Sequence, residues 1–318
     1  MVRWSDGVPG LTRALALCAA FLAMNSARAR DDVPAPQPPP LYETRAGADR
    51  IGRILVPIKV NDRGPFRFVL DTGANRTVLT PRLAEILGLQ VSHDSRITMS
   101  GVTGSALVPT VAVDHVRAGE VVLKGQHLPV ADSLSSDVDG ILGVDLLGDT
   151  RVIVDFTADK VQIRKAHREG VLDGMKRVPA KFRFGRLLVV QATIGRIPVK
   201  AVIDTGSEYT LANLALRQRL GFREGFTASN TTDVIGETLA RQRGERRQVP
   251  VLRIGGAIQI AHPTVIFGEF YVFRLWDLEA EPAVVVGMDM IGSLEAFLID
   301  YQRGEIQVRP HADPLDAR

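Results

Sequence analysis

The chain has 318 residues, of which 45% are apolar and 24% are charged, and its formal net charge is +3. This composition is typical of a folded globular protein, and the length is sufficient for two domains. The sequence has no basic stripe, no run of like charges and no nucleic-acid motif, so we expect no nucleic-acid partner.

The first 29 residues have the pattern of a secretory signal peptide. Arg3 and Arg13 precede an apolar run from Ala14 to Met24, which is followed by Ala27-Arg28-Ala29. The apolar run is about half the roughly 20 residues that a membrane-spanning helix needs. We therefore expect cleavage after Ala29 and a periplasmic or secreted location, with a retained anchor as the alternative.

The single cysteine, Cys18, lies within this apolar run. A cleaved chain would contain no thiol, which excludes disulfides, thiolate catalysis and cysteine metal sites. The six histidines show no metal-ligand spacing. We expect neither a metal nor a cofactor.

Short β-branched runs follow one another from about residue 42 to residue 310, separated by Gly, Asp and Asn turns. This pattern predicts a protein built mostly of strands. A proline-rich segment precedes the region and predicts an extended spacer. The expected divisions are a spacer at 30–41, an N-terminal domain at 42–168, a C-terminal domain at 178–310 and a tail at 311–318, with the joint within Lys165 to Arg177.

The two domains repeat one sequence pattern. Gly52-Arg53-Ile54-Leu55-Val56 recurs as Gly185-Arg186-Leu187-Leu188-Val189, and Phe68-Val69-Leu70-Asp71-Thr72-Gly73 recurs at the same spacing as Ala201-Val202-Ile203-Asp204-Thr205-Gly206. Several matches in one register indicate an internal duplication.

A short helix is predicted next in each copy. Thr80 and Asn213 are typical N-cap residues, and Gly88 and Gly221 suit the left-handed position that ends a helix. Further on, the apolar run Ile141-Leu142-Gly143 corresponds to Val285-Val286-Gly287, each followed within two residues by an aspartate. For these aspartates, Asp145 and Asp289, we favour a helix N-cap over a functional role.

Two Asp-Thr-Gly motifs, each closing an apolar strand inside a matching repeat, carry the main functional signal. With Ala74, Ser207 and the two apolar-Gly runs, they resemble the retropepsin-like and pepsin-like aspartic protease clan. Within this clan the chain most resembles the bacterial periplasmic members that have two fused retropepsin-like lobes. The resemblance implies an all-β acid-protease fold with two pseudo-twofold-related, barrel-like lobes. Each lobe would carry one short helix, the active site would lie between them, and the chain would act as a monomer.

The resemblance also implies roles for the motif residues. Asp71 and Asp204 would share one proton across an attacking water, and Thr72 and Thr205 would reach into the opposite lobe to lock the pair. Gly73 and Gly206 would let backbone amides approach the carboxylates. We further expect the hydroxyl of Ser207 to donate to Asp204, for which Ala74 has no counterpart, so that Asp204 ionises more readily and Asp71 keeps the shared proton.

Two flaps are expected to close over the substrate. The candidate residues are Ser100, Gly101, Val102, Thr103 and Gly104 in the first flap, and Val234, Ile235 and Gly236, followed by Glu237, in the second. An ordinary hairpin turn is the alternative for the second flap. Neither flap contains the tyrosine that pepsin-like enzymes have there. The aromatic stretch 267–276 could line a substrate subsite, but we favour a role in packing.

The expected function is therefore an aspartic endopeptidase that cleaves a protein or peptide substrate. Export suggests that the substrate is an envelope or membrane protein. The alternative is a catalytically silent member of the same fold that only binds peptides or partner proteins.

Overall fold

The computed structural model describes residues 43–45, 47–49, 52–132, 137–222 and 230–311. The predicted signal peptide (1–29) and spacer (30–41) lie outside these residues, as does the predicted tail beyond His311. The described elements belong to one compact unit, Leu41–Arg318, which is mostly β, and this confirms the predicted all-β class. None of the helices in the described segments is long and apolar enough to cross a membrane.

The first half of this unit contains eleven strands and one helix within the described residues. In chain order they are β1 (Glu43–Arg45), β2 (Gly47–Ala48), β3 (Ile54–Val60), β4 (Arg63–Leu70), β5 (Val78–Leu79), α1 (Pro81–Leu87), β6 (Val91–Ser100), β7 (Ser105–Ala118), β8 (Val121–Pro129), β9 (Gly140–Leu142), β10 (Thr150–Asp155) and β11 (Lys160–Lys165).

The second half follows the same order at first and then adds further elements. They are β12 (Lys176–Arg183), β13 (Leu187–Ile194), β14 (Ile197–Ile203), β15 (Leu211–Ala212), α2 (Leu214–Arg219), β16 (Thr231–Ile235), β17 (Arg241–Gln248), β18 (Leu252–Ile254), β19 (Ile258–Ile260), β20 (Thr264–Phe267), α3 (Tyr271–Leu275), β21 (Ala283–Val286), α4 (Met288–Ile291), β22 (Leu294–Asp300) and β23 (Glu305–Pro310).

Each half places its Asp-Thr-Gly motif at the end of a buried central strand. In the first half β3 pairs with β4, β9 lies parallel to β4, and β5 pairs antiparallel with β9. In the second half β13, β14, β21 and β15 are paired in the same way. The last residues of β4 and β14 are apolar and buried, as expected for strands that have a parallel neighbour. The duplication seen in the sequence is therefore a duplication of strand pairing.

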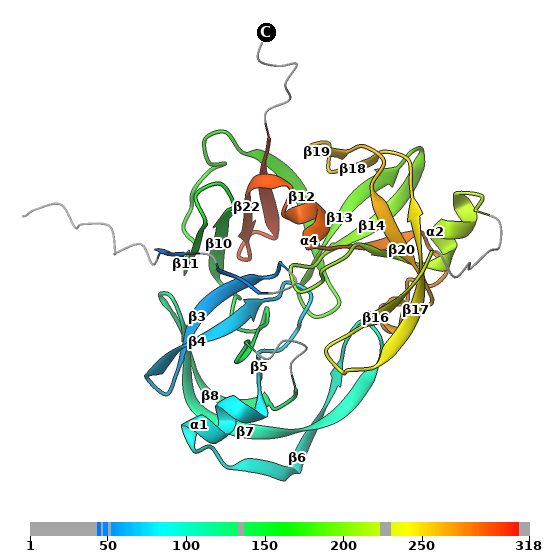
Figure 1. Cartoon of the computed structure of the whole chain (residues 1–318). Helices are drawn as coiled ribbons and strands as arrows, with labels where there is room; N and C mark the ends of the chain where they lie inside the picture. The colour runs from blue at the N-terminus through cyan, green and yellow to red at the C-terminus, as the bar shows by residue number, and fades with distance from the viewer. Residues whose placement is uncertain (1–42, 46, 50–51, 133–136, 223–229, 312–318) are drawn as a thin grey trace, which may run out of the picture. The chain divides into compact units, whose positions relative to one another are not determined.

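A sheet shared by both halves joins them. Its strand order is β1-β11-β10-β22-β23-β12, and β10 pairs with β22 so that Val152 lies opposite Ile299 (Figure 1). Arg151 and Asp300 are paired in the same register, and their fully buried side chains form an ion pair at 3.0 Å. Apolar residues from both halves belong to one hydrophobic core.

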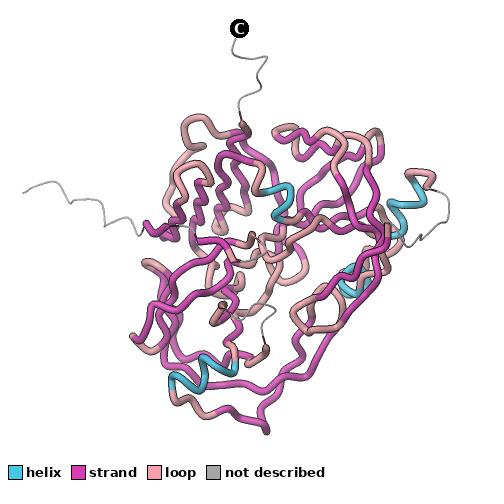
Figure 2. The backbone as a smooth tube through the Cα atoms, viewed as in Figure 1, coloured by secondary structure: helices cyan, strands magenta, loops and turns pink. Residues whose placement is uncertain are grey.

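The predicted helices are present and are capped as their sequences indicate. The Thr80 hydroxyl accepts from the Leu83 amide at the start of α1, and the Asn213 side chain accepts from the Leu216 amide at the start of α2. Gly88 follows α1 with φ 68°, and Gly221 lies just beyond α2 with φ 72°. The second half differs from the expectation of one helix, because it also contains α3 and α4; Figure 2 shows the short helices among the strands.

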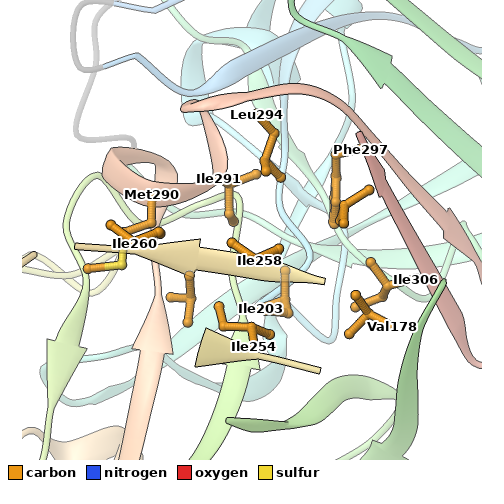
Figure 3. A pocket seen from close by; sticks show the side chains of 12 residues that line it. Val178, Ile203, Ile254, Ile258, Ile260, Met290, Ile291, Leu294, Phe297 and Ile306 are labelled. Atoms are coloured by element: carbon orange, nitrogen blue, oxygen red, sulfur yellow. The ribbon is translucent and has the colours of Figure 1, made fainter. Parts of the chain in front are cut away.

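An apolar cavity of about 20 Å³ lies behind the strand that leads to Asp204. Its lining includes Ile203 from β14, Ile254 and Ile258 from the β18–β19 hairpin, and Ile306 from β23 (Figure 3). Because the lining is almost entirely apolar, a water molecule would find no hydrogen-bond partners there. The cavity is therefore a small packing defect and does not have the volume of a ligand site.

Candidate active site

The two aspartates lie at equivalent points of the two halves. The Asp71 amide donates to the carbonyl oxygen of Leu142 at 3.0 Å, and the Asp204 amide donates to that of Val286 at 3.0 Å. Leu142 and Val286 end the apolar strands β9 and β21, which run parallel to β4 and β14. The apolar-Gly runs recognised in the sequence thus hold the aspartate backbones in place.

The carboxyl groups of Asp71 and Asp204 face each other in a confined space. Asp71 is 4% exposed and Asp204 is 6% exposed. The Gly73 amide donates to Asp71 Oδ1 at 2.8 Å, and the Gly206 amide donates to Asp204 Oδ1 at 2.8 Å. A Cβ atom at Gly73 would overlap the Asp204 carboxylate, and one at Gly206 would overlap that of Asp71. Glycine is needed at both positions because each loop approaches the opposite carboxylate so closely.

Thr72 and Thr205 cross between the halves beneath this pair. The Thr72 hydroxyl donates to the Ile203 carbonyl oxygen at 2.8 Å, and the Thr205 hydroxyl donates to that of Leu70 at 2.6 Å. Each hydroxyl also accepts from the amide of the other threonine, at 3.1 Å in both cases. Four buried hydrogen bonds therefore fix the two Asp-Thr-Gly loops relative to each other.

The electrostatic surroundings of the two carboxyl groups differ. Burial and the Asp204 carboxylate raise the pKa of Asp71 to about 8. Burial and the Glu237 carboxylate raise the pKa of Asp204 to about 6, and the hydrogen bond between the two side chains favours the charged form of Asp204. Two carboxyl groups this close cannot both be ionised at low cost, so one proton is shared between them. The higher pKa of Asp71 favours the proton on Asp71 and the charge on Asp204.

The expected cause of this asymmetry is wrong, although the expected direction agrees with the pKa values. The Ser207 hydroxyl donates to the Tyr209 carbonyl oxygen at 2.8 Å and makes a local turn contact instead of binding Asp204. The groups that lower the pKa of Asp204 are the backbone amide of Gly206, the Asp71 side chain and, with the smallest effect, the backbone amide of Ser207. Serine hydroxyls commonly bond to a backbone group two residues away, which competes with longer-range partners.

Asp145 and Asp289 brace the loops that follow the catalytic motifs, so their interpretation as helix N-caps is wrong. Asp145 accepts from both the amide and the hydroxyl of Thr77, and Asp289 does the same with Thr210. The threonine hydroxyls in turn accept from the amides of Gly143 and Gly287 at 3.1 and 3.0 Å. Each brace ties the segment after an Asp-Thr-Gly motif to its apolar-Gly strand. For α4, the N-cap position is occupied by Gly287.

The structure brings the predicted flap residues of the two halves together. The first flap is the β6–β7 hairpin, whose turn is closed by the Gly101 amide donating to Gly104 at 2.8 Å, and the second is the β16–β17 hairpin (Figure 1). The Thr103 hydroxyl donates to the Ala240 carbonyl oxygen at 2.8 Å and accepts from the Gly236 amide at 3.0 Å. The two hairpins are thereby joined through one threonine side chain.

Helix α3 also contacts the first flap. The Val272 amide donates to the Val102 carbonyl oxygen at 3.1 Å, and hydrogen bonding to Ser105 and Ser100 lowers the pKa of Tyr271. A tyrosine thus contacts the flap although neither flap contains one. The aromatic side chains of the surrounding stretch are buried and fill the interior, as expected: Phe267, Phe270, Phe273 and Trp276.

Glu237 lies directly after the predicted second-flap residues and is a charged group near the two aspartates. The sequence predicted no chemical role for it. Its side chain is 22% exposed, and its Oε1 lies 3.9 Å from Arg53 Nη1. Burial and the Asp71 carboxylate raise the pKa of Glu237 to about 7. The internal repeat could not reveal this residue because it lies outside the matched segments.

Among the described residues, no group of three or more histidine, cysteine, aspartate or glutamate side chains is arranged to hold a metal ion. The site offers two buried carboxyl groups, one protonated and one ionised, with backbone amides fixing both. Such a pair can act as a general acid and a general base on one substrate.

Comparison with known proteins agrees with this chemistry. No curated protein matches the chain. Residues 56–146 match the model of a family described as aspartyl protease. The match includes Asp71-Thr72-Gly73, the first flap and the β9 strand that holds Asp71. Over these residues the chain is similar to the aspartyl proteases.

Proposed function

We propose that the chain is an aspartic endopeptidase whose catalytic residues are Asp71 and Asp204. The observation that carries the proposal is the pair of buried carboxyl groups held face to face at the ends of β4 and β14 by the amides of Gly73 and Gly206. Support also comes from the aspartyl protease match over residues 56–146.

The mechanism follows from the different ionisation of the two groups. Asp204, as the carboxylate, takes a proton from a water molecule while the water oxygen attacks the carbonyl carbon of the peptide bond. Asp71, as the carboxylic acid, donates its proton to the carbonyl oxygen, which gives a neutral tetrahedral diol. The roles then reverse. Asp204 donates a proton to the amide nitrogen, Asp71 takes a proton from a hydroxyl of the diol, and the C–N bond breaks. One proton is again shared by the pair. The threonine hydrogen bonds keep the two groups aligned through both steps.

We infer that the substrate binds as an extended chain between the aspartates and the flaps, where its backbone can pair as an added strand. The bond between Thr103 and the second flap must open for this to happen. We further propose that the protein works outside the cytoplasm, as a monomer, on an envelope or membrane protein, because the N-terminal sequence is typical of export.

Substitution of either aspartate tests the proposal. We expect Asp71→Asn and Asp204→Asn each to reduce cleavage of an unfolded protein by at least about a hundredfold, because each removes one partner of the acid–base pair. Asp114→Asn, an exposed aspartate on β7, is the matched control and should retain full activity. Cleavage is measured by gel and mass spectrometry after circular dichroism has shown that each variant is folded.

If the wild-type protein and both dyad variants cleave at the same rate, or none of them cleaves, the protease proposal fails. Peptide binding without cleavage would instead favour the catalytically silent alternative.

A further inference from the structure

A third carboxyl group reaches the catalytic pair from the second flap. Glu237 lies in the turn between β16 and β17, and its Oε2 would be 3.4 Å from a Cβ atom at Gly101 in the tip of the first flap. The group is therefore enclosed by both flaps. The carboxylates of Glu237, Asp71 and Asp204 are also close enough to influence one another's pKa.

Glu237 also lines a small cavity beside the Asp71 loop. The other lining residues are Val78, Leu79, Thr80, Met99, Ala131, Asp132, Gly140 and Ile141. Strand β9 forms one wall, and it pairs with β4 so that Ile141 lies opposite Val69, two residues before Asp71. The cavity is thus adjacent to the point where a bound peptide would be cut.

The lining of this cavity combines apolar side chains with carboxyl groups. Val78, Leu79, Met99 and Ile141 form an apolar wall, and Glu237 and Asp132 add two carboxyl groups. A lysine or arginine side chain has the complementary form, because its methylene stem packs on apolar surface while its charged end remains with polar groups.

The cation nearest to Glu237 in the structure is already engaged elsewhere. Arg53 binds Asp49 through Nε at 2.8 Å and through Nη2 at 2.7 Å. Its distance of 3.9 Å to Glu237 is longer than a hydrogen bond. Arg53 therefore compensates the charge of Glu237 only partly, and a second cation close to Glu237 would be favourable.

We propose that Glu237 is a specificity-determining residue that makes the enzyme prefer a lysine or arginine side chain in this cavity, next to the bond that is cut. The inference rests on the proposed peptide hydrolysis and names its substrate class. With the flaps closed, the cavity of about 10 Å³ has room for no such side chain. The second flap must therefore lift to admit the side chain and remain raised while it is bound, with the Glu237 carboxylate on the substrate cation.

The inference is tested by cleavage of a mixed peptide library, with the cut sites identified by mass spectrometry. We expect the wild type to enrich lysine and arginine at one position beside the cut by roughly tenfold or more, as for a charge-assisted hydrogen bond in a partly enclosed site. Glu237→Gln keeps the size of the side chain and should lower this enrichment to about threefold or less while cleavage continues. Asp233→Asn removes an exposed charge from the same hairpin and should leave the enrichment unchanged.

Two results would overturn the inference: a wild type without enrichment of basic residues beside the cut, and a Glu237→Gln variant that keeps the full enrichment. A second measurement separates this failure from failure of the protease proposal. Binding of a lysine-containing decapeptide pool and of a pool with methionine in its place is compared by calorimetry on Asp71→Asn, with and without Glu237→Gln. A lysine preference that Glu237→Gln removes supports the inference even if no cleavage is found. Equal affinities for the two pools would contradict it.

Discussion

At the scale of single residues, the site depends on two aspartates that are chemically identical but placed in different surroundings. Apart from the effect of burial, the pKa of Asp71 is raised by the Asp204 carboxylate and lowered by the Gly73 amide and by Arg53, whereas that of Asp204 is raised by the Glu237 carboxylate and lowered by the amides of Gly206 and Ser207. The two halves of the duplication have therefore diverged in the atoms around the carboxyl groups while keeping the motif itself.

This asymmetry predicts how activity depends on pH. Asp204 must be ionised, which requires a pH above its pKa of about 6, and Asp71 must be protonated, which requires a pH below its pKa of about 8. We expect kcat/KM to follow a bell-shaped profile with a maximum near pH 7, whose limbs report the coupled pair. The measurement is kcat/KM of one peptide from pH 4 to pH 9.

Glu237→Gln should move the acidic limb only slightly to lower pH, because the Glu237 charge raises the pKa of Asp204 but Glu237, with a pKa of about 7, is mostly protonated at the pH where Asp204 titrates. The control Asp233→Asn should leave the profile in place. An optimum below pH 5 in the wild type would contradict the assigned ionisation states.

The meeting of the two Asp-Thr-Gly motifs could be predicted from the sequence because the motif occurs twice in one register. The roles of Asp145 and Asp289 could not, since an aspartate near a strand end also fits a helix N-cap, and only the fold places each beside a threonine from another segment. The sequence placed Glu237 in a flap but predicted no chemical role for it. Its partners Arg53 and Asp71 are distant in the chain and come close to it only through tertiary packing.

At the scale of elements, the flaps are joined by a contact that neither has alone. Thr103 is 6% exposed, and its hydroxyl bonds to two backbone groups of the second hairpin. The connection is one-sided, because the first flap supplies the side chain and the second supplies the backbone.

We expect Thr103→Val to loosen both flaps. The substitution keeps the shape of the side chain but removes both hydrogen bonds, each of which contributes about 1 kcal/mol. Amide hydrogen exchange in residues 101–104 and 236–240 should then accelerate by roughly tenfold, as measured by mass spectrometry. Thr98→Val, at an exposed position on the same hairpin, is the control. Unchanged exchange at the tips in Thr103→Val would show that the flaps are held by other contacts.

The predicted elements agree best with the structure where local signals are strong. The caps of α1 and α2 are local hydrogen bonds between neighbouring residues, and the sequence indicated them correctly. Helices α3 and α4 gave no such signal, because neither has a side-chain N-cap hydrogen bond. They are short and are stabilised by burial of residues such as Phe273 and Ile291 in the core.

At the scale of the whole described unit, the two halves depend on each other for folding. Strands β10 and β22 place the buried Arg151 and Asp300 side by side, and the same hydrophobic core extends through both halves. Removing Arg151 would leave the buried Asp300 without this cation, whereas removing Asp300 would leave Arg151 with Glu169 as its ion-pair partner. This dependence could not be read from the sequence, where the repeat suggested two separate units.

The apolar cavity behind Asp204 offers a test of how tightly this core is packed. Val308→Ile adds one methylene group at a position that lines the cavity, and we expect a gain of about 0.5–1 kcal/mol in the free energy of unfolding. Val154→Ile is the matched control at a fully buried site that does not line the cavity. It should cost about 1–3 kcal/mol through overpacking. Denaturant unfolding gives both values, and a loss of stability in Val308→Ile would show that the space is not usable.

The unequal flaps have a consequence for the direction in which a peptide can lie. A site with true twofold symmetry presents the same surroundings to a chain entering in either orientation. Here the carboxylate of Glu237 is on one flap, and the cavity that it lines is beside the loop of only one aspartate. The site therefore distinguishes the two orientations of a bound peptide. A peptide with the reversed sequence of a good substrate should be cleaved poorly.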